Sequence, residues 1–248
     1  MPEELTAAAY VERLGAHQSD EERAKIQRYF KSSEGGDGDG DDVFMGVRMR
    51  DVFALSEELK AMPLGEIEKL LDSPVHEVRA GGLKIMAKQA AGKKTPDEQR
   101  RALYDLYLRR IDRIDNWDLV DLAAWDVVGR WLADRPRDVL YELARSDNVW
   151  ERRTAILATL HFARRGDLDD TFALAETLLD DDHDLIHKPV GGMLREAGKH
   201  DRLRLLTFLD AHAATMPRTT LRYAVEHLDK ALKAHYMGLA KSAGGRRG

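Results

Sequence analysis

Apolar residues recur with a period near 3.6 residues in almost every segment of this chain, and almost no segment alternates with period 2. Ala, Leu, Arg, Glu and Asp dominate, whereas Val, Ile and Thr are sparse, which also favours helix. The pattern therefore predicts an all-α protein. Its 248 residues, 43% of them hydrophobic, are ample for a sizeable buried core.

The chain contains faint internal repeats, in which a turn is followed by an apolar helix with an early cation. Four stretches can be aligned on that cation, which is Arg79, Arg153, Lys188 or Arg222. Successive cations are 74, 35 and 34 residues apart. The longest step leaves room for a further unit near Asp118. A period near 35 residues is typical of HEAT-like helical repeats, so we predict a solenoid. The alternative is an irregular helical bundle.

We expect one helical-repeat domain over residues 1–237 and a flexible C-terminal tail over residues 238–248. Within the domain, residues 33–42 hold four Gly and five acidic residues, a composition that cannot build a core and predicts a flexible loop. The DGDGDD run could indicate calcium binding. The bidentate Glu that ends an EF-hand loop is missing, however, and a plain solvated loop is favoured.

The phased cations suggest a binding surface. Equivalent positions of a solenoid share one surface, so a row of cations on a concave face would suit a phosphate backbone. The alternative is that these arginines pair with nearby carboxylates. A net charge of −5 argues weakly against nucleic acid, but it is an average over the whole chain.

The unit near Asp118 offers acid and aromatic residues where the others offer a cation. On a continuous helix, Trp117, Asp121 and Trp125 would share one face, with Asp118 capping or pairing near the helix start. A carboxylate between indoles would stabilise positive charge on a ligand held by its phosphates. The alternative is that the tryptophans are core residues and Asp121 pairs with an arginine.

Several stretches together resemble the AlkD-type DNA glycosylases, HEAT-like-repeat proteins that remove alkylated purines from DNA. The resemblance covers roughly residues 20–230 and rests on NWDLVD at 116–121, SDNVWERRTAIL at 146–157 and KPVGGMLREAGK at 188–199. FMGVRMRDV at 44–52 and SPVHEVRAGGL at 73–83 support it.

The resemblance implies a role for each matching residue. Asp121 aligns with the catalytic aspartate, Trp117 with a pocket aromatic, and Arg153 and Arg195 with arginines that contact DNA. The family's second pocket tryptophan is Gly192 here, and we expect Trp125 also to line the pocket. Gly192 would leave room for a bulky adduct. The alternative is a close approach of two helices that requires glycine.

The implied activity is that of a monofunctional glycosylase, which hydrolyses the N-glycosidic bond of N3- or N7-alkylated purines in duplex DNA. No lysine nucleophile aligns with the pocket, and no HExxH or phosphate-binding glycine motif is present. We therefore expect no metal and no cofactor. The rival functions are a repeat protein that binds damaged or branched DNA without excision, and a protein-binding scaffold.

The compartment is inferred from what the chain lacks. It has no Cys, its N-terminus is acidic where a signal peptide would be basic, and no apolar run reaches the length of a membrane span. We expect a cytoplasmic monomer.

Overall fold

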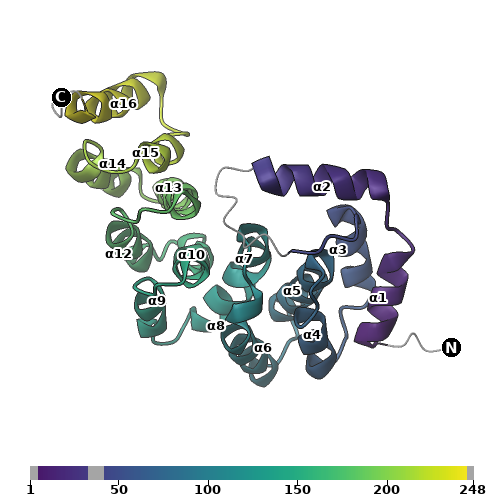
Figure 1. Cartoon of the computed structure of the whole chain (residues 1–248). Helices are drawn as coiled ribbons and strands as arrows, with labels where there is room; N and C mark the ends of the chain where they lie inside the picture. The colour runs from purple at the N-terminus through teal and green to yellow at the C-terminus, as the bar shows by residue number, and fades with distance from the viewer. Residues whose placement is uncertain (1–4, 33–41, 245–248) are drawn as a thin grey trace. The chain divides into compact units, whose positions relative to one another are not determined.

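The structure is a computed structural model that describes residues 5–32 and 42–244 (Figure 1). In these ranges every regular element is a helix, apart from one isolated parallel bridge between Val43 and Val75. The all-α prediction is confirmed. The chain divides into two compact units, Met1–Trp131 and Leu132–Gly248, which are described separately below.

The first unit is built around a long, almost fully buried helix. Its elements are α1 (Ala7–Gly15), α2 (Asp20–Ser32), α3 (Met49–Glu58), α4 (Leu64–Leu71), α5 (His76–Ala91), α6 (Asp97–Arg109), the 3-10 turn η1 (Ile111–Arg113), α7 (Trp117–Ala123) and the π-helix η2 (Ala124–Gly129). The short α8 (Arg130–Leu132) follows. Helix α5 packs on α3, α4 and α7, and these lie around it in Figure 1.

A buried carboxylate ties the segment before α3 to helix α5. Glu77, in the first turn of α5, accepts hydrogen bonds from the backbone N–H groups of Met45 (3.1 Å), Gly46 (2.9 Å) and Val47 (3.2 Å). Gly46 has φ +82°, a conformation that residues with a Cβ rarely adopt. These bonds compensate the burial of Glu77 and fix the entry into α3.

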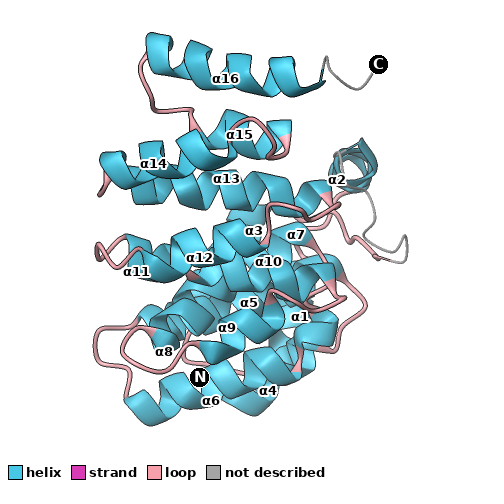
Figure 2. Cartoon of the chain, turned by 90° about the vertical axis from the view of Figure 1, so that its left-hand side faces the viewer, coloured by secondary structure: helices cyan, strands magenta, loops and turns pink. Residues whose placement is uncertain are grey.

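The second unit is a series of packed helices centred on α13. Its elements are α9 (Asp138–Leu143), α10 (Val149–Ala158), α11 (Leu160–Ala163), α12 (Asp169–Thr177), α13 (Asp184–Gly198), α14 (Arg202–His212), α15 (Arg218–Ala224) and α16 (Lys230–Gly244). Helix α13 contacts α10, α12, α14 and α15. Figure 2 shows these helices in successive layers, from α9 and α10 to α16.

Two predicted boundaries need comment. Residues 33–41 of the predicted loop lie outside the described residues, whereas Asp42 is described and makes several hydrogen bonds. The chain does not leave helix at residue 237, where we expected a tail to begin. Helix α16 continues to Gly244, in a stretch rich in the strong helix formers Ala, Leu and Lys.

Candidate active site and phosphate-binding residues

The candidate catalytic residues lie on the short helix α7 of the first unit. Asn116 caps this helix by accepting a hydrogen bond from the backbone N–H of Trp117 at 2.8 Å. Trp117 is half-buried, and Asp121, one turn later, is exposed. Leu119, Val120 and Ala123 are buried. An exposed carboxylate therefore follows an indole by one helical turn.

An aromatic cluster lies beside Trp117. Its ring centroid is 6.2 Å from that of Tyr29, in an edge-on arrangement, and 6.0 Å from that of Phe30. Both residues come from the last turns of α2, and Tyr29 is 55% exposed. Neither residue was predicted from the sequence to belong to the site. The available signal was an adjacent aromatic pair in a largely charged helix.

Trp125 does not stand in the expected relation to Asp121. The i, i+4, i+8 spacing assumes a continuous α-helix, but α7 ends at Ala123 and η2 continues as a π-helix that includes Trp125. A π-helix bonds i to i+5 and so changes the phase of its residues. Trp125 is half-buried, and whether it reaches a substrate stays a prediction.

A buried histidine connects α5 to the start of α7. The His76 side chain is fully buried between two carboxylates, with Nδ1 3.0 Å from Asp42 Oδ2 and Nε2 2.8 Å from Asp118 Oδ2. Burial alone would lower the pKa of His76, but the two carboxylates outweigh it and raise that pKa to about 9. Asp118 thus pairs with His76, while the cap is Asn116.

The helix caps give a register for the repeats that differs from the cation alignment. Helices α5, α7, α10, α13 and α15 have as N-cap residues Val75, Asn116, Asn148, His183 and Pro217. Counted from these caps, the fifth residues are Ala80, Asp121, Arg153, Lys188 and Arg222. Arg79 is therefore one position out of phase, and Asp121 occupies the position of the three cations.

Arg79 belongs instead with Arg152 and His187, the fourth residues after their caps. Each donates to the carbonyl of the residue two before its cap: Arg79 Nη1 to Ser73 O (3.2 Å), Arg152 Nη1 to Ser146 O (2.9 Å), and His187 Nε2 to Asp181 O. We call this arrangement the turn clasp. Arg79 is 2% exposed and also pairs with Asp42 and Asp115, which argues against a phosphate contact.

Arg153 is buried in the second unit and bonded to the backbone of α13. The residue is 6% exposed, and its Nη1 donates to the carbonyl oxygen of Leu185. That carbonyl lies four residues before Pro189, which is inside α13 and has no N–H to donate to it. Arg153 thus supplies the hydrogen bond that the proline cannot.

The other predicted phosphate contacts are more accessible. Lys188 is half-buried, and Arg222 is exposed, with its guanidinium 5.6 Å from the ring centroid of Tyr223. Arg195 forms ion pairs with Glu196 and Glu226, and the Glu226 side chain is itself about half exposed. Surface ion pairs contribute little, so a phosphate can replace such a carboxylate.

The adjacent glycines of α13 differ in their surroundings. A Cβ on Gly191 would lie 2.3 Å from the carbonyl oxygen of Thr220, so the approach of α15 requires glycine there. A Cβ on Gly192 would meet nothing within 4 Å. Close helix packing therefore explains Gly191 and does not explain Gly192.

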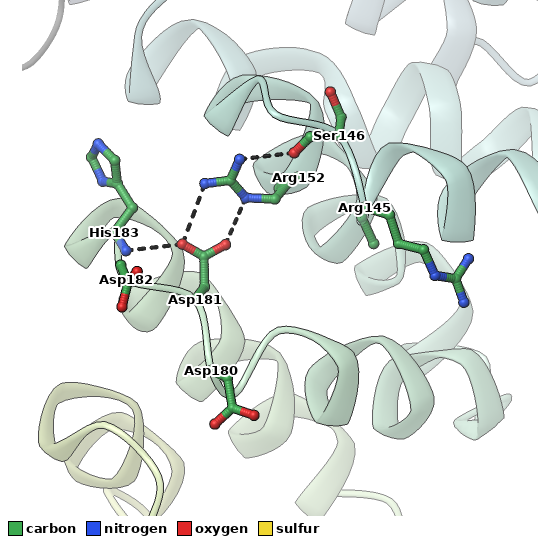
Figure 3. A pocket seen from close by; sticks show the side chains of 8 residues that line it. Arg145, Ser146, Arg152, Asp180, Asp181, Asp182 and His183 are labelled. Atoms are coloured by element: carbon green, nitrogen blue, oxygen red, sulfur yellow. Dashed lines mark hydrogen bonds and ion pairs between the residues drawn. The ribbon is translucent and has the colours of Figure 1, made fainter.

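A cavity in the second unit is lined by the turns before α10 and α13 (Figure 3). The Arg152 guanidinium lies in it, paired with Asp181 (Nε to Oδ2, 2.6 Å), and Arg145 points away from this pair. The cavity therefore contains one turn clasp, the hydrogen bond from Arg152 to Ser146 O. Within the described ranges no group of three or more His, Asp or Glu residues could hold a metal ion, and no described helix has the length and apolar character to cross a membrane.

Comparisons with known proteins agree with this architecture. The family model for the DNA alkylation repair enzyme matches residues 10–228. A solved structure described as a predicted DNA alkylation repair enzyme from Enterococcus faecalis superposes with a TM-score of 0.65 at 18% identity, over 86% of this chain and 98% of that one. No curated protein matches. Since the family model covers most of the sequence, the chain belongs to the DNA alkylation repair enzyme family.

Proposed function

We propose that this protein is a monofunctional DNA glycosylase that hydrolyses the N-glycosidic bond of N3- or N7-alkylated purines in duplex DNA. The main support for this proposal is the exposed carboxylate of Asp121, one turn after Trp117. Both residues lie on helix α7, whose first turn is held by the contact of Asp118 with His76. Membership of a DNA alkylation repair family supports a DNA substrate.

The chemistry needs one carboxylate and one water. Alkylation at N3 or N7 makes the purine cationic, and the electron pair of the breaking bond to C1′ stays with the base and neutralises it. Positive charge then develops on the sugar. In this mechanism Asp121 stabilises that charge, and water adds to C1′ and loses its proton as Asp121 orients or deprotonates it.

The aromatic cluster provides the complementary recognition. The faces of Trp117 and Tyr29 attract a cationic base and exclude water from the carboxylate. The assignments of Trp125 and Gly192 to the substrate pocket remain predictions that rest on the sequence and its resemblance. A residue without a side chain at position 192 favours adducts larger than a methyl group.

DNA binding in this proposal relies on the phase that the helix caps define. Arg153, Lys188 and Arg222 share that phase, and Arg195 lies on the same helix as Lys188. Their charges would hold the phosphate backbone. Arg79 is left out of the set, because it is one position out of phase and pairs with two carboxylates.

The alternative function is binding of damaged or branched DNA without excision of a base. The observation that favours it is Gly192, which stands where the family has an aromatic pocket residue. The two functions separate in one experiment. Duplexes that carry N3- or N7-alkylated purines are incubated with the parent and with Asp121→Asn, and released bases are identified by mass spectrometry. Base release by the parent alone supports the glycosylase; binding without release supports the alternative.

A further inference from the structure

The buried cluster around His76 holds the start of the candidate catalytic helix from two sides. His76 Nε2 binds Asp118, in the first turn of α7, and Asn116, the cap of α7, donates its Nδ2 to Asp42 Oδ2 at 3.0 Å. Asp42 in turn binds His76 Nδ1. One carboxylate and one ring therefore link both anchor points of α7.

The hydrogen bonds require a doubly protonated ring. An ionised carboxylate only accepts hydrogen bonds, and a neutral imidazole has one N–H to donate. Because each ring nitrogen of His76 lies within 3.0 Å of a carboxylate oxygen, satisfying both contacts needs an imidazolium. The rings of Phe30 and Phe44, with centroids 4.9 and 5.1 Å from that of His76, keep water from the cluster.

The charged neighbours of His76 favour this state. Asp42 and Asp118 contact the ring, Arg79 pairs with Asp42, and Asp115 pairs with Arg79. Burial would raise the pKa of Asp42, but His76 and Arg79 together hold it well below its usual range. Burial raises the pKa of Asp115, against the opposing effect of Arg79.

Helix α7 depends on these anchors. It has seven residues and passes directly into the π-helix η2, and so short a helix has little stability of its own. The second oxygen of Asp118, Oδ1, is buried and makes no hydrogen bond to any described residue. His76 is therefore the hydrogen-bond partner that holds this carboxylate.

We propose that the His76 imidazolium is a positioning residue for the candidate active site, which holds the first turn of α7 through Asp118 and thereby sets the place of Trp117 and Asp121. The catalytic part of this inference rests on the proposed function; the positioning of α7 does not. Loss of one proton leaves a single N–H for two carboxylates, and one anchor is released.

The sign of the pH dependence follows from the raised pKa of His76. The stability that the imidazolium contributes is fully present below the unfolded value of about 6.5 and is lost as pH rises through about 9. Excision should decline over the same range, because α7 loosens.

The test reads the position of Trp117 directly. The full chain is labelled with 5-fluorotryptophan, the Trp117 signal is identified from Trp117→Phe, and its chemical shift is followed from about pH 6 to pH 10. In the parent the shift should follow the titration of the His76 ring, recorded by NMR in the same samples. In His76→Gln this titration should vanish, and in Asp118→Asn its midpoint should fall, because the neutral amide no longer stabilises the cation.

The matched control is His17→Gln, the same exchange at an exposed histidine of the first unit, which should leave the Trp117 titration unchanged. Single-turnover excision on a methylated duplex should fall about tenfold per pH unit above the midpoint in the parent and lose this limb in His76→Gln. The inference would be overturned if the Trp117 chemical shift did not follow the His76 titration. It would also be overturned if the fall of the excision rate at alkaline pH were the same in His76→Gln as in the parent. If no duplex is excised by the parent, the proposed function fails, and the fluorine titration alone decides the positioning of α7.

Discussion

Arg153 and Pro189 are coupled through one carbonyl oxygen. Pro189 removes the backbone donor that would bond Leu185 O inside α13, and Arg153 donates its Nη1 to that oxygen from α10. A buried carbonyl without a donor is costly, so the two residues complement each other. The family resemblance implies that Arg153 contacts DNA, and the structure shows that Arg153 also bonds the backbone of its own unit.

This coupling predicts a non-additive pair of mutations. Arg153→Ala should lower the free energy of unfolding by about 1–3 kcal/mol, because Leu185 O loses its donor. In a Pro189→Ala background the new N–H can bond Leu185 O, and the same mutation should cost measurably less. Urea denaturation of the parent, both single variants and the double variant measures the coupling. Strict additivity would contradict it.

Asp121→Asn should reduce single-turnover excision by about 10²–10³-fold and leave duplex affinity equal or higher. The amide keeps the size of the side chain and loses the charge that stabilises the sugar cation and repels phosphates. Asp126→Asn is the control on the adjoining π-helix, where Asp126 pairs with Arg130 at 2.7 Å. An Asp121→Asn protein that excises at the parental rate would show that Asp121 is not the catalytic carboxylate.

Tyr29→Ala should slow excision by up to about tenfold, the scale of one aromatic contact, whereas Tyr29→Phe should retain the rate. The melting temperature should change little in either variant, because the residue is more than half exposed. Rates and thermal melts on the same preparations make the comparison. Equal losses in both variants would assign the effect to the hydroxyl group.

Arg222→Ala and Arg195→Ala should each flatten the dependence of log K on log salt by about one unit, since under the proposed function each variant loses one phosphate contact. Arg79→Ala should leave this slope unchanged and instead cost on the order of 2–3 kcal/mol of stability, because Asp42 and Asp115 lose a buried partner. Duplex titrations at several salt concentrations, with urea denaturation, separate the two classes. A flatter slope for Arg79→Ala would restore it as a DNA contact.

The two glycines of α13 should respond in opposite directions to alanine. Gly191→Ala should destabilise the protein by about 1–3 kcal/mol, because the new Cβ meets the Thr220 carbonyl. Gly192→Ala should stabilise it by about 0.5–1 kcal/mol, because the site is open and alanine favours helix. Thermal or urea denaturation decides. Destabilisation by both would mean that position 192 is also packed.

Gly192→Trp tests whether position 192 determines the preferred size of the alkyl adduct. If position 192 faces the lesion, the indole should slow excision of a bulky alkylpurine adduct and spare or improve that of a methylated one. The stability of Gly192→Ala is the reference for any change in folding. Equally slowed excision of both substrates would show that position 192 does not determine the preferred adduct size.

The sequence predicted the helical class and the one-turn separation of Trp117 and Asp121 because both depend on local spacing. Trp117 and Asp121 are separated by one turn of α-helix whatever surrounds them. Trp125 failed this logic because a π-helix begins between it and Asp121. No residue pattern in that stretch marks the change of phase.

Long-range contacts explain the remaining differences. Arg79 and Arg153 look equivalent in sequence because each is an early cation in an apolar helix, and only the caps show that they differ by one position. The role of His76 was not predicted, because its partners, Asp42 and Asp118, lie 34 and 42 residues away in the sequence. Tyr29 was missed for the same reason.

The cap register also places an acid and three bases at one equivalent position of successive repeats. If the proposed function holds, a single change of side-chain charge at this position distinguishes a repeat that binds the phosphate backbone from the repeat that carries the catalytic carboxylate, with no new fold and no inserted loop. Asp121→Arg would reverse that exchange, turning a candidate repair enzyme into a tighter, chemically silent clamp. In such a scaffold, one equivalent position of the repeat can carry either a catalytic carboxylate or a phosphate-binding cation.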